Sequence, residues 1–243
     1  MTPSIRQLIQ QIGWCDFLIR ATSRALAALS LGKVKLHRDY IVVQPLAAVG
    51  SGPVRRTGSF VIRSLGSSCD PLVARLPRPQ EEIRERFASG AECFVAERDG
   101  EPVAFLWVHR ASFLDAEVRS RFLVEPYGKA VWDFDVYVDP RFRGSTIFWR
   151  LWQEASRILL SRGVEWSISR ISAENDGSIS AHRRMGAYPV ATAIHLCIGR
   201  IKVTLSDMSP HVHFSFSESR HPCYRVNAQE ARRRRYFRFA SAA

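Results

Sequence analysis

The chain has 243 residues, and 46% of them are hydrophobic, which is enough to fill the core of one ordinary domain with an extension or of two small domains. Its net charge of +12 indicates a surface that suits phosphates, anionic lipid or other acidic partners. This composition excludes a disordered chain, and the lack of any run of eighteen apolar residues predicts that no helix crosses a membrane.

Cysteine usage indicates a reducing compartment. The five cysteines are odd in number, widely separated and without a Cys-x-x-Cys pair, so we expect neither a disulfide framework nor a structural zinc site. His211 and His213 form a His-x-His pair near His221 and Cys223, but no carboxylate accompanies them, and we predict no metal site there. The N-terminus lacks a signal-peptide cleavage site. We therefore expect a cytoplasmic protein, with peripheral attachment to a membrane left open.

Residues 3–31 are predicted to form one long helix that ends at Gly32. Apolar residues recur at helical spacing along one face, whereas arginines and glutamines mark the other. Such a helix can lie on an anionic membrane, or it can pack on its own domain or on a second subunit as in a homodimer. Its apolar stripe is wide for a free surface helix, so we expect it to serve association rather than chemistry.

The next segments suggest how the chain is divided. Residues 40–44 are β-rich and are predicted to be a strand, and residues 47–58 are rich in Gly, Ser and Pro. We therefore predict an N-terminal segment at 1–57, a main domain at 58–218 and a basic tail at 219–243. The arginines and aromatics of that tail could bind nucleic acid or anionic lipid, or could be a solvated helix end.

Within the main domain, several elements are predicted from local patterns. A helix is predicted to begin at Pro79 and to end at Gly90. Asp99-Gly100 separates two β-rich runs, which predicts a hairpin. Further strands are predicted by three later segments, which are 166–172, 188–205 and 211–216.

The segment 131–151 carries the strongest local pattern. Trp132, Phe134, Val136 and Val138 alternate with polar residues, which predicts a strand with Asp133, Asp135 and Tyr137 on its second face. A short turn rich in Arg and Gly follows, and then helical spacing continues to Gly163. The first N–H groups of a helix are unpaired and point outward, so this basic turn is predicted to bind an anion such as phosphate.

Two motifs resemble the GNAT superfamily, the N-acyltransferases that use acyl-coenzyme A. The first is Val138-x-Pro140-x-x-Arg143-Gly144 before a helix, and the second is the segment from Asn175 through His182 to Gly186-Ala187. The resemblance covers about residues 60–205, and it implies a first strand at residues 60–63 followed by a first helix near Asp70. It implies an α/β fold with a GNAT-like mixed, mostly antiparallel central sheet flanked by helices, to which this chain adds an N-terminal helical extension.

The resemblance also implies a site. Asp135 is expected to be the general base, and His182 stands where many members carry a tyrosine that acts as the acid. The alternatives are that Asp133 and Asp135 neutralise nearby arginines, that His182 is a surface residue, and that Tyr137 or Tyr188 donates the proton. Coenzyme A is expected to contact the backbone or side chains of Val136, Val138, Arg141, Arg143, Gly144, Ser145, Thr146 and Asn175. Asn175 could instead only cap the following helix.

One departure from the family pattern concerns the phosphate turn. Thr146 and Phe148 occupy positions where the family has small residues. The Phe148 ring either shields its own N–H or turns into the core beside Trp152. We expect an acyltransferase that moves an acyl group, acetyl by preference, from acyl-CoA to an amine on a small molecule or protein, without a metal and without a nucleic-acid partner. The alternatives are an acyl-carrier-protein donor and a non-catalytic binding module.

Overall fold

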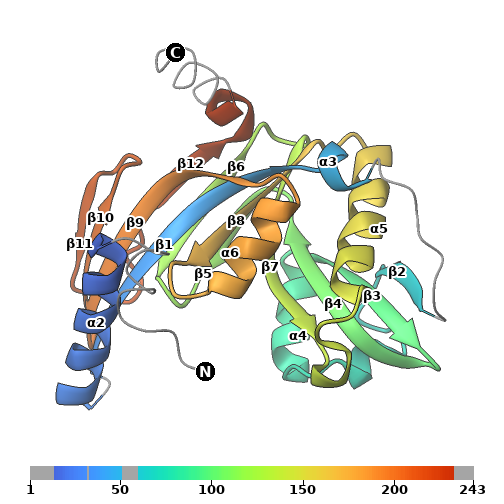
Figure 1. Cartoon of the computed structure of the whole chain (residues 1–243), viewed down its shortest axis with the longest axis horizontal. Helices are drawn as coiled ribbons and strands as arrows, with labels where there is room; N and C mark the ends of the chain where they lie inside the picture. The colour runs from blue at the N-terminus through green and yellow to red at the C-terminus, as the bar shows by residue number, and fades with distance from the viewer. Residues whose placement is uncertain (1–13, 32, 51–59, 233–243) are drawn as a thin grey trace.

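The structure is a computed structural model that describes residues 14–31, 33–50 and 60–232. It has a mixed α/β fold whose main sheet contains nine strands in the order β11-β10-β9-β1-β8-β7-β4-β3-β2 (Figure 1). Neighbours in this sheet are antiparallel except for β7 and β8. The strands are β1 (Val34–Pro45), β2 (Val61–Leu65), β3 (Glu92–Arg98), β4 (Glu101–His109), β7 (Ala130–Val138), β8 (Trp166–Ser172), β9 (Tyr188–Ile198), β10 (Ile201–Ser206) and β11 (Val212–Ser215).

Strand β1 lies inside the main sheet, between β8 and β9. It pairs with β8 from Asp39 to Pro45 and with β9 from Val34 to Val43. The segment that we expected to stand apart as residues 1–57 therefore supplies a strand to the same sheet as the main domain.

A second, three-stranded sheet packs on one face of the first. It consists of β5 (Ser112–Asp115), β6 (Ser120–Glu125) and β12 (Cys223–Asn227), in the order β12-β6-β5. Strand β12 comes from the expected C-terminal tail and runs parallel to β6. Residues 219–232 thus belong in part to the folded domain, whereas residues 233–243 lie outside the described part of the chain.

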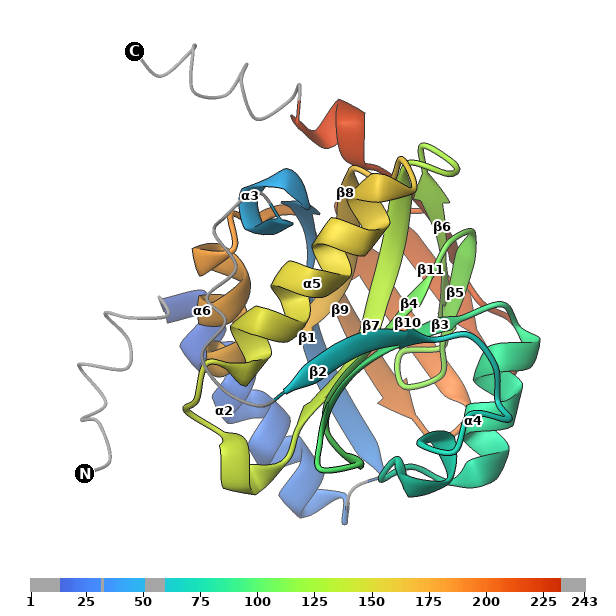
Figure 2. The same ribbon diagram turned by 90° about the vertical axis from the view of Figure 1, so that its right-hand side faces the viewer.

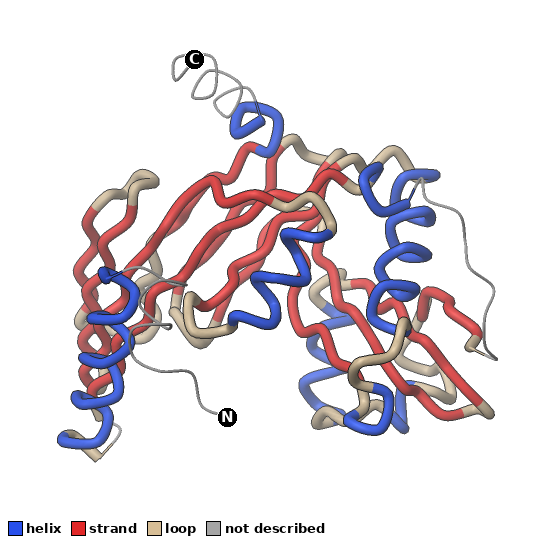
Figure 3. Tube along the Cα trace, viewed as in Figure 1, coloured by secondary structure: helices blue, strands red, loops and turns tan. Residues whose placement is uncertain are grey.

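Helices cover both faces of the sheet (Figures 2 and 3). α5 (Ile147–Ser161) and α4 (Gln80–Ala88) lie on opposite sides of β3 and β4, where alternate residues of each strand enter two separate cores. A third core, built around Trp132 and Tyr224, lies between the two sheets. Short elements join these layers, namely α3 (Ala47–Gly50), η1 (Val73–Arg75) and η2 (Pro140–Phe142).

The described part of the predicted N-terminal helix is α2 (Trp14–Leu29), which packs against β1. The Arg20 guanidinium forms an ion pair of 2.7 Å with Asp176 at the start of α6 (Asp176–Arg184), and the Ser23 hydroxyl donates to the Leu36 carbonyl at 2.8 Å. This helix therefore packs on its own domain. Residues 3–13 of the prediction lie outside the described range, and no described helix is both long and apolar enough to span a bilayer.

Most local predictions in the main domain are confirmed. The hairpin around Asp99-Gly100, the strand 166–172 and the helix after Pro79 all form. The helix expected near Asp70 is wrong, because that region holds only the short turn η1. Asp70 binds the Arg63 guanidinium and accepts from the Leu72 N–H, so its side chain organises a loop.

Candidate active site

A gap between two parallel strands forms the centre of the candidate site. β7 and β8 pair only from Ala130 to Trp132 on β7, opposite residues 166–168 of β8. Beyond these residues β7 continues to Val138 and β8 to Ser172 without pairing with each other, and the two strands diverge (Figure 1). Backbone groups of β7 beyond Trp132 thus face an opening instead of a neighbouring strand.

A β-bulge at Asp135 changes the direction of β7 at this opening. The pairing with β4 shifts between Leu106 and Trp107, so Trp107 pairs with Phe134 and Leu106 with Val136, and Asp135 has no partner. Asp135 has a φ of 47°, in the left-handed region that Asp tolerates better than most residues. The strict alternation expected for this strand is therefore wrong. Asp133 and Asp135 lie on opposite faces of the sheet, because Phe134 and Asp135 both point to the side of α4.

The bulge leaves two N–H groups directed into the gap. The Asp139 N–H donates to the Val103 carbonyl at 2.9 Å, so it points toward β4. Because successive N–H groups along a strand point to alternate edges, those of Val138 and Val136 point toward β8. These are the two backbone groups expected from the sequence to contact the donor, and both face the opening.

Asp135 is held between two arginines. Its carboxylate accepts from Arg78 Nε at 2.8 Å and from Arg86 Nη1 at 2.5 Å, and Arg78 Nη2 makes a third contact. Burial opposes ionisation of this carboxyl group, but the hydrogen bonds from the arginines prevail and hold its pKa below the usual range. A general base needs a free oxygen and a raised pKa. The contacts of Asp135 instead match the alternative in which this residue neutralises arginines.

The basic turn after β7 has the geometry expected of an anion site. Asp139 accepts from the Arg141 N–H at 2.8 Å and binds the Arg141 guanidinium, and Gly144 has a φ of 80° with open space beside it. Arg143, Gly144, Ser145 and Thr146 are all exposed. Thr146 makes no side-chain cap at the start of α5, whereas the Ser145 hydroxyl accepts from the Ile147 N–H at 3.3 Å, so an anion at this helix end would bind the next N–H groups of the first turn.

Phe148 turns toward the core. It is half-buried and packs against the cluster that contains Ile147, Leu151 and Trp152. This is the second of the two orientations considered from the sequence, in which the ring leaves the phosphate turn uncovered. The aromatic residue in place of a small one is thereby accommodated without closing the turn.

His182 and Asp133 form a buried pair beside the gap. Asp133 Oδ2 accepts from the hydroxyls of Ser167 and Ser169, each at 2.6 Å, and Asp133 Oδ1 lies 3.9 Å from His182 Nε2. His182 Nδ1 lies 2.8 Å from the Ser178 carbonyl oxygen, and only an N–H there can form this bond. The alternative of a surface histidine is wrong, because both side chains are buried.

This pairing favours the charged form of the histidine. Burial disfavours the imidazolium, but the nearby Asp133 carboxylate and the Ser178 carbonyl outweigh it, and the pKa of His182 is raised. Nε2 has no hydrogen-bond partner among the described residues. A proton on Nε2 is therefore held by charge attraction alone and can be donated to a group that enters the gap.

Other polar groups lie nearby. Asn175 caps α6, since its side-chain oxygen accepts from the Ser178 N–H at 3.0 Å, which matches the simpler of its two expected roles. Gln44 is buried on the face that carries Ser167, and neither polar atom of its side chain has a partner among the described residues. Sequence reasoning missed Gln44, Ser167 and Ser169. The serines at alternate positions of β8 could have indicated a polar face on that strand, whereas nothing in the sequence pointed to Gln44.

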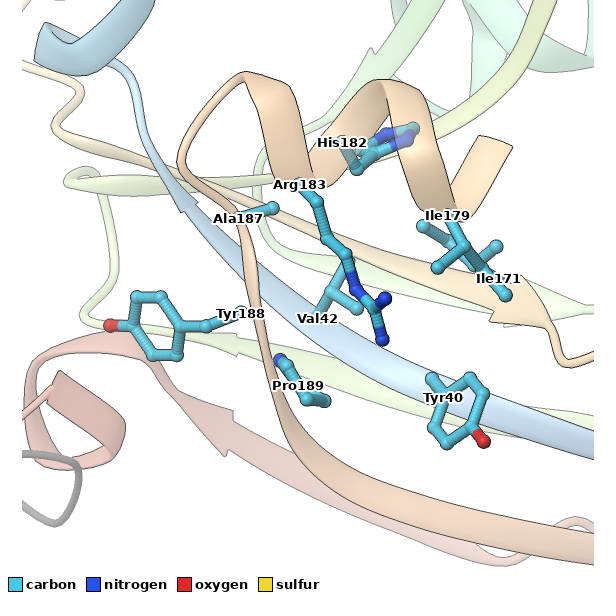
Figure 4. Close-up of a pocket in the computed structure, with 9 residues that line it drawn as sticks. All are labelled: Tyr40, Val42, Ile171, Ile179, His182, Arg183, Ala187, Tyr188 and Pro189. Atoms are coloured by element: carbon cyan, nitrogen blue, oxygen red, sulfur yellow. The ribbon is translucent and has the colours of Figure 1, made fainter. Parts of the chain in front are cut away.

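A pocket opens between α6 and strands β1, β8 and β9, and His182 is among the residues that line it (Figure 4). Arg183 extends from α6 toward Tyr40, whereas the His182 ring points away from that side chain. Tyr188 also lines this pocket. Apolar walls with one guanidinium suit an apolar group that carries a negative charge. Within the described ranges, no cluster of three or more His, Cys, Asp or Glu residues could hold a metal ion.

The two motifs that resemble the GNAT superfamily border this site, one at the turn before α5 and the other along α6. Comparison with protein families agrees, because residues 62–187, more than half of the chain, match the model of the acetyltransferase (GNAT) family. The chain belongs to this family. No curated protein matches it.

Several solved structures are similar at low identity. A functionally unknown conserved protein from Staphylococcus epidermidis shares 12% identity with a TM-score of 0.48, and 81% of each chain is covered. A tandem GNAT protein from the clavulanic acid biosynthesis pathway shares 14% with a TM-score of 0.46, covering 68% of this chain and 55% of that one. A GCN5-related N-acetyltransferase from Kribbella flavida shares 14% with a TM-score of 0.43, covering 70% and 62%. This chain thus spans less than two thirds of the latter two.

Proposed function

We propose that this protein transfers an acyl group, acetyl by preference, from an acyl-coenzyme A thioester to an amine. The observation that carries the proposal is the gap between β7 and β8, into which the N–H groups of Val136 and Val138 point. Two fixed N–H donors in a water-poor gap stabilise the negative charge that develops on a carbonyl oxygen during acyl transfer. An ordinary parallel pair would use these groups for the sheet.

The exposed turn before α5 would hold the donor phosphates. Its backbone at Gly144, the first turn of α5 and the side chain of Arg143 supply N–H groups and positive charge. Coenzyme A supplies the thioester that activates the acyl group. The packing of Phe148 against the core cluster supports this assignment over a ring folded onto the turn.

His182 would return a proton to the departing thiolate. Its imidazole lies beside the gap, its Nδ1–H is anchored on Ser178, and the neighbouring Asp133 carboxylate helps to raise its pKa, which favours the protonated ring. We assign Asp133 as a positioning residue, since it acts through the histidine. With Asp135 engaged by Arg78 and Arg86, we propose that the amine reacts in its free-base form after losing its proton to water. The rate should then rise with pH until His182 loses its own proton.

The test is coenzyme A release from acetyl-coenzyme A over a panel of primary amines, followed by chromatography because Cys69 and Cys223 are exposed thiols that would react with a thiol dye. We expect His182→Ala to lower turnover by about a hundredfold, the low end of the range for general acids, since solvent can also protonate a thiolate. His211→Ala, at an exposed histidine outside the site, is the matched control and should leave turnover unchanged. Equal rates for wild type and His182→Ala on a reactive amine would remove His182 from the mechanism.

The runner-up is a binding module that keeps the fold without the chemistry. It is favoured by one observation, the double ion pair that occupies the carboxylate of Asp135. Calorimetric titration with coenzyme A separates the two proposals, since binding without turnover on any amine favours the module. If free coenzyme A does not bind but an acylated carrier protein supports turnover, the donor is the carrier.

A further inference from the structure

The pocket beneath α6 is not used by the reaction proposed above, although His182 lines part of its wall. Three neighbouring strands form its floor, with Tyr40 on β1, Ile171 on β8 and Pro189 on β9, and α6 lies over them (Figure 4). Its volume is about 90 Å³. A dry cavity of roughly 150 Å³ holds benzene in another protein, so this pocket has room for a short aliphatic group.

The local sequence explains why this space is not filled by the protein itself. Pro189 and Ala191 pair with consecutive residues of β1, so Val190 has no partner and β9 contains a bulge, which bends the strand. The chain leaves α6 at Gly186, whose φ is 83°, and Ala187 brings only a methyl group to the pocket. A bent strand and two small residues thus leave a hollow between α6 and the sheet.

Positive charge gathers at this pocket without an acid to neutralise it. Among the described residues that line it, Arg183 and His182 are basic and none is acidic. The Arg183 side chain extends from α6 toward Tyr40 (Figure 4), and it forms no ion pair within the described part of the chain. The Arg38 guanidinium lies 5.6 Å from the centre of the Tyr40 ring and adds a second cation there. The acid in the first turn of α6 is already paired with α2, so the pocket favours a negatively charged ligand.

The walls restrict the class of anion. Val42 and Ile171 are buried and Ile179 is half-buried, so an aliphatic tail between them would be removed from water. A carboxylate matches the planar guanidinium of Arg183 with two parallel hydrogen bonds. A phosphate would also match this guanidinium but would leave the apolar walls unused, and an ammonium group on the ligand would be repelled by the two arginines. The pocket therefore fits an aliphatic monocarboxylate without an amino group.

We propose that this pocket binds a short-chain aliphatic carboxylate, whose tail lies between α6 and the three strands and whose carboxylate pairs with Arg183. The ligand would pack on the helix that carries His182, so the environment of that ring should change on binding. The proposal concerns a binding site and stands independently of the proposed acyl transfer.

The test is titration of the full chain with isovalerate at constant pH, followed by the NMR resonances of the histidine rings. We expect saturable shifts of the His182 resonances with a dissociation constant on the order of 1–10 mM, as suits so small a ligand. Two probes separate tail from charge. Isoamyl alcohol has the same tail without the charge, and inorganic phosphate has charge without the tail, so each should bind about tenfold more weakly than isovalerate.

Substitutions in α6 test the position of the ligand. Arg183→Met should weaken isovalerate about tenfold, because it removes the charged hydrogen-bond donor and keeps an aliphatic stem. The matched control is Arg184→Met, at the next residue of the helix, which is also exposed but does not line the pocket, and it should bind like the wild type. A second variant, Ile179→Trp, fills the space between α6 and the strands and should prevent binding. Circular dichroism melts verify that each variant is folded.

Three outcomes would overturn the proposal. The first is a wild type whose His182 resonances do not respond to isovalerate at any concentration. The second is a folded Arg183→Met variant that binds isovalerate as tightly as the wild type, which would place the ligand elsewhere. The third is a probe that binds at least as tightly as isovalerate: the alcohol would show that the pocket is only apolar, and phosphate would show that it is a phosphate site.

Discussion

Replacing Asp135 by asparagine tests whether this carboxylate shapes the active site or acts as its base. Asparagine has nearly the same size and also tolerates the positive φ of this bulge, so the change removes little except the charge. The side chains of Asp135 and Arg86 are 15% and 13% exposed, and that of Arg78 is 28% exposed. Breaking a fully buried ion pair costs about 3–5 kcal/mol, so this partly buried cluster should lose about 2–4 kcal/mol.

For a chain of this size, such a loss lowers Tm by roughly 5–15 °C. The pH dependence gives an independent measure. Because the folded pKa of Asp135 is lowered, its stabilisation is present above the unfolded value near 3.9 and is lost as pH falls through the folded value. The difference in unfolding free energy between wild type and Asp135→Asn should therefore shrink in acid, as measured by urea titrations between pH 3 and 7.

The matched control is Asp99→Asn. Asp99 also has a positive φ, of 54°, but its exposed side chain lies 3.5 Å from Arg98 and makes no closer ion pair among the described contacts. We expect this variant to melt like the wild type. The single variants Arg78→Met and Asp135→Asn should both lower turnover, since each removes part of the ion-pair cluster that holds the bulge. If Asp135→Asn instead kept the wild-type Tm and removed a limb of the pH–rate profile, the carboxylate would be a base and the positioning role would be refuted.

Two further outcomes are expected from the site. Asp133→Asn should lower the pKa of His182, as read from its imidazole resonances in an NMR pH titration; the raised pKa in the wild type stabilises the fold below the unfolded value near 6.5, and this stabilisation is lost as pH rises through the folded value. An unchanged His182 titration would show that Asp133 does not set its charge. Phe148→Gly with Thr146→Gly should destabilise the protein by about 2–4 kcal/mol without tightening coenzyme A in calorimetry, because the Phe148 ring packs in the core. A tenfold gain in affinity would mean that the ring covers the turn.

Local signals explain why much of the fold was predictable. β8 was predicted with the bounds it has, since apolar residues and serines alternate from Trp166 to Ser169, and α5 follows from its apolar spacing and Gly163. The bulge at Asp135 was not predicted, because the extra residue does not interrupt the alternation of apolar and polar residues in the sequence. The remaining hint was an aspartate within a strand, where that residue is uncommon.

Partnerships between distant segments could not be read from the sequence. The order β9-β1-β8 depends on pairing residues 34–45 with strands more than 120 positions later, and no periodicity records that. The same holds for β12 and β6, which are short and a hundred residues apart. At the site, the predicted positions of His182, Val136 and Val138 do lie around one gap. The sequence pattern placed Asp133 and Asp135 on one face of the strand. The bulge separates the two, so only Asp133 lies near His182.

The central place of β1 also bears on how the chain is made. A ribosome releases residues 34–45 early, but of their two neighbours in the sheet β9 is complete only after residue 198 has emerged, and even β8 only after residue 172. Until then Ile41 and Val43, which are fully buried in the finished fold, have no partner to pair with. Such non-local pairing slows folding and prolongs the exposure of apolar, aggregation-prone segments. A fragment that begins at residue 58 would leave β8 and β9 with open edges, so expression of the domain requires β1.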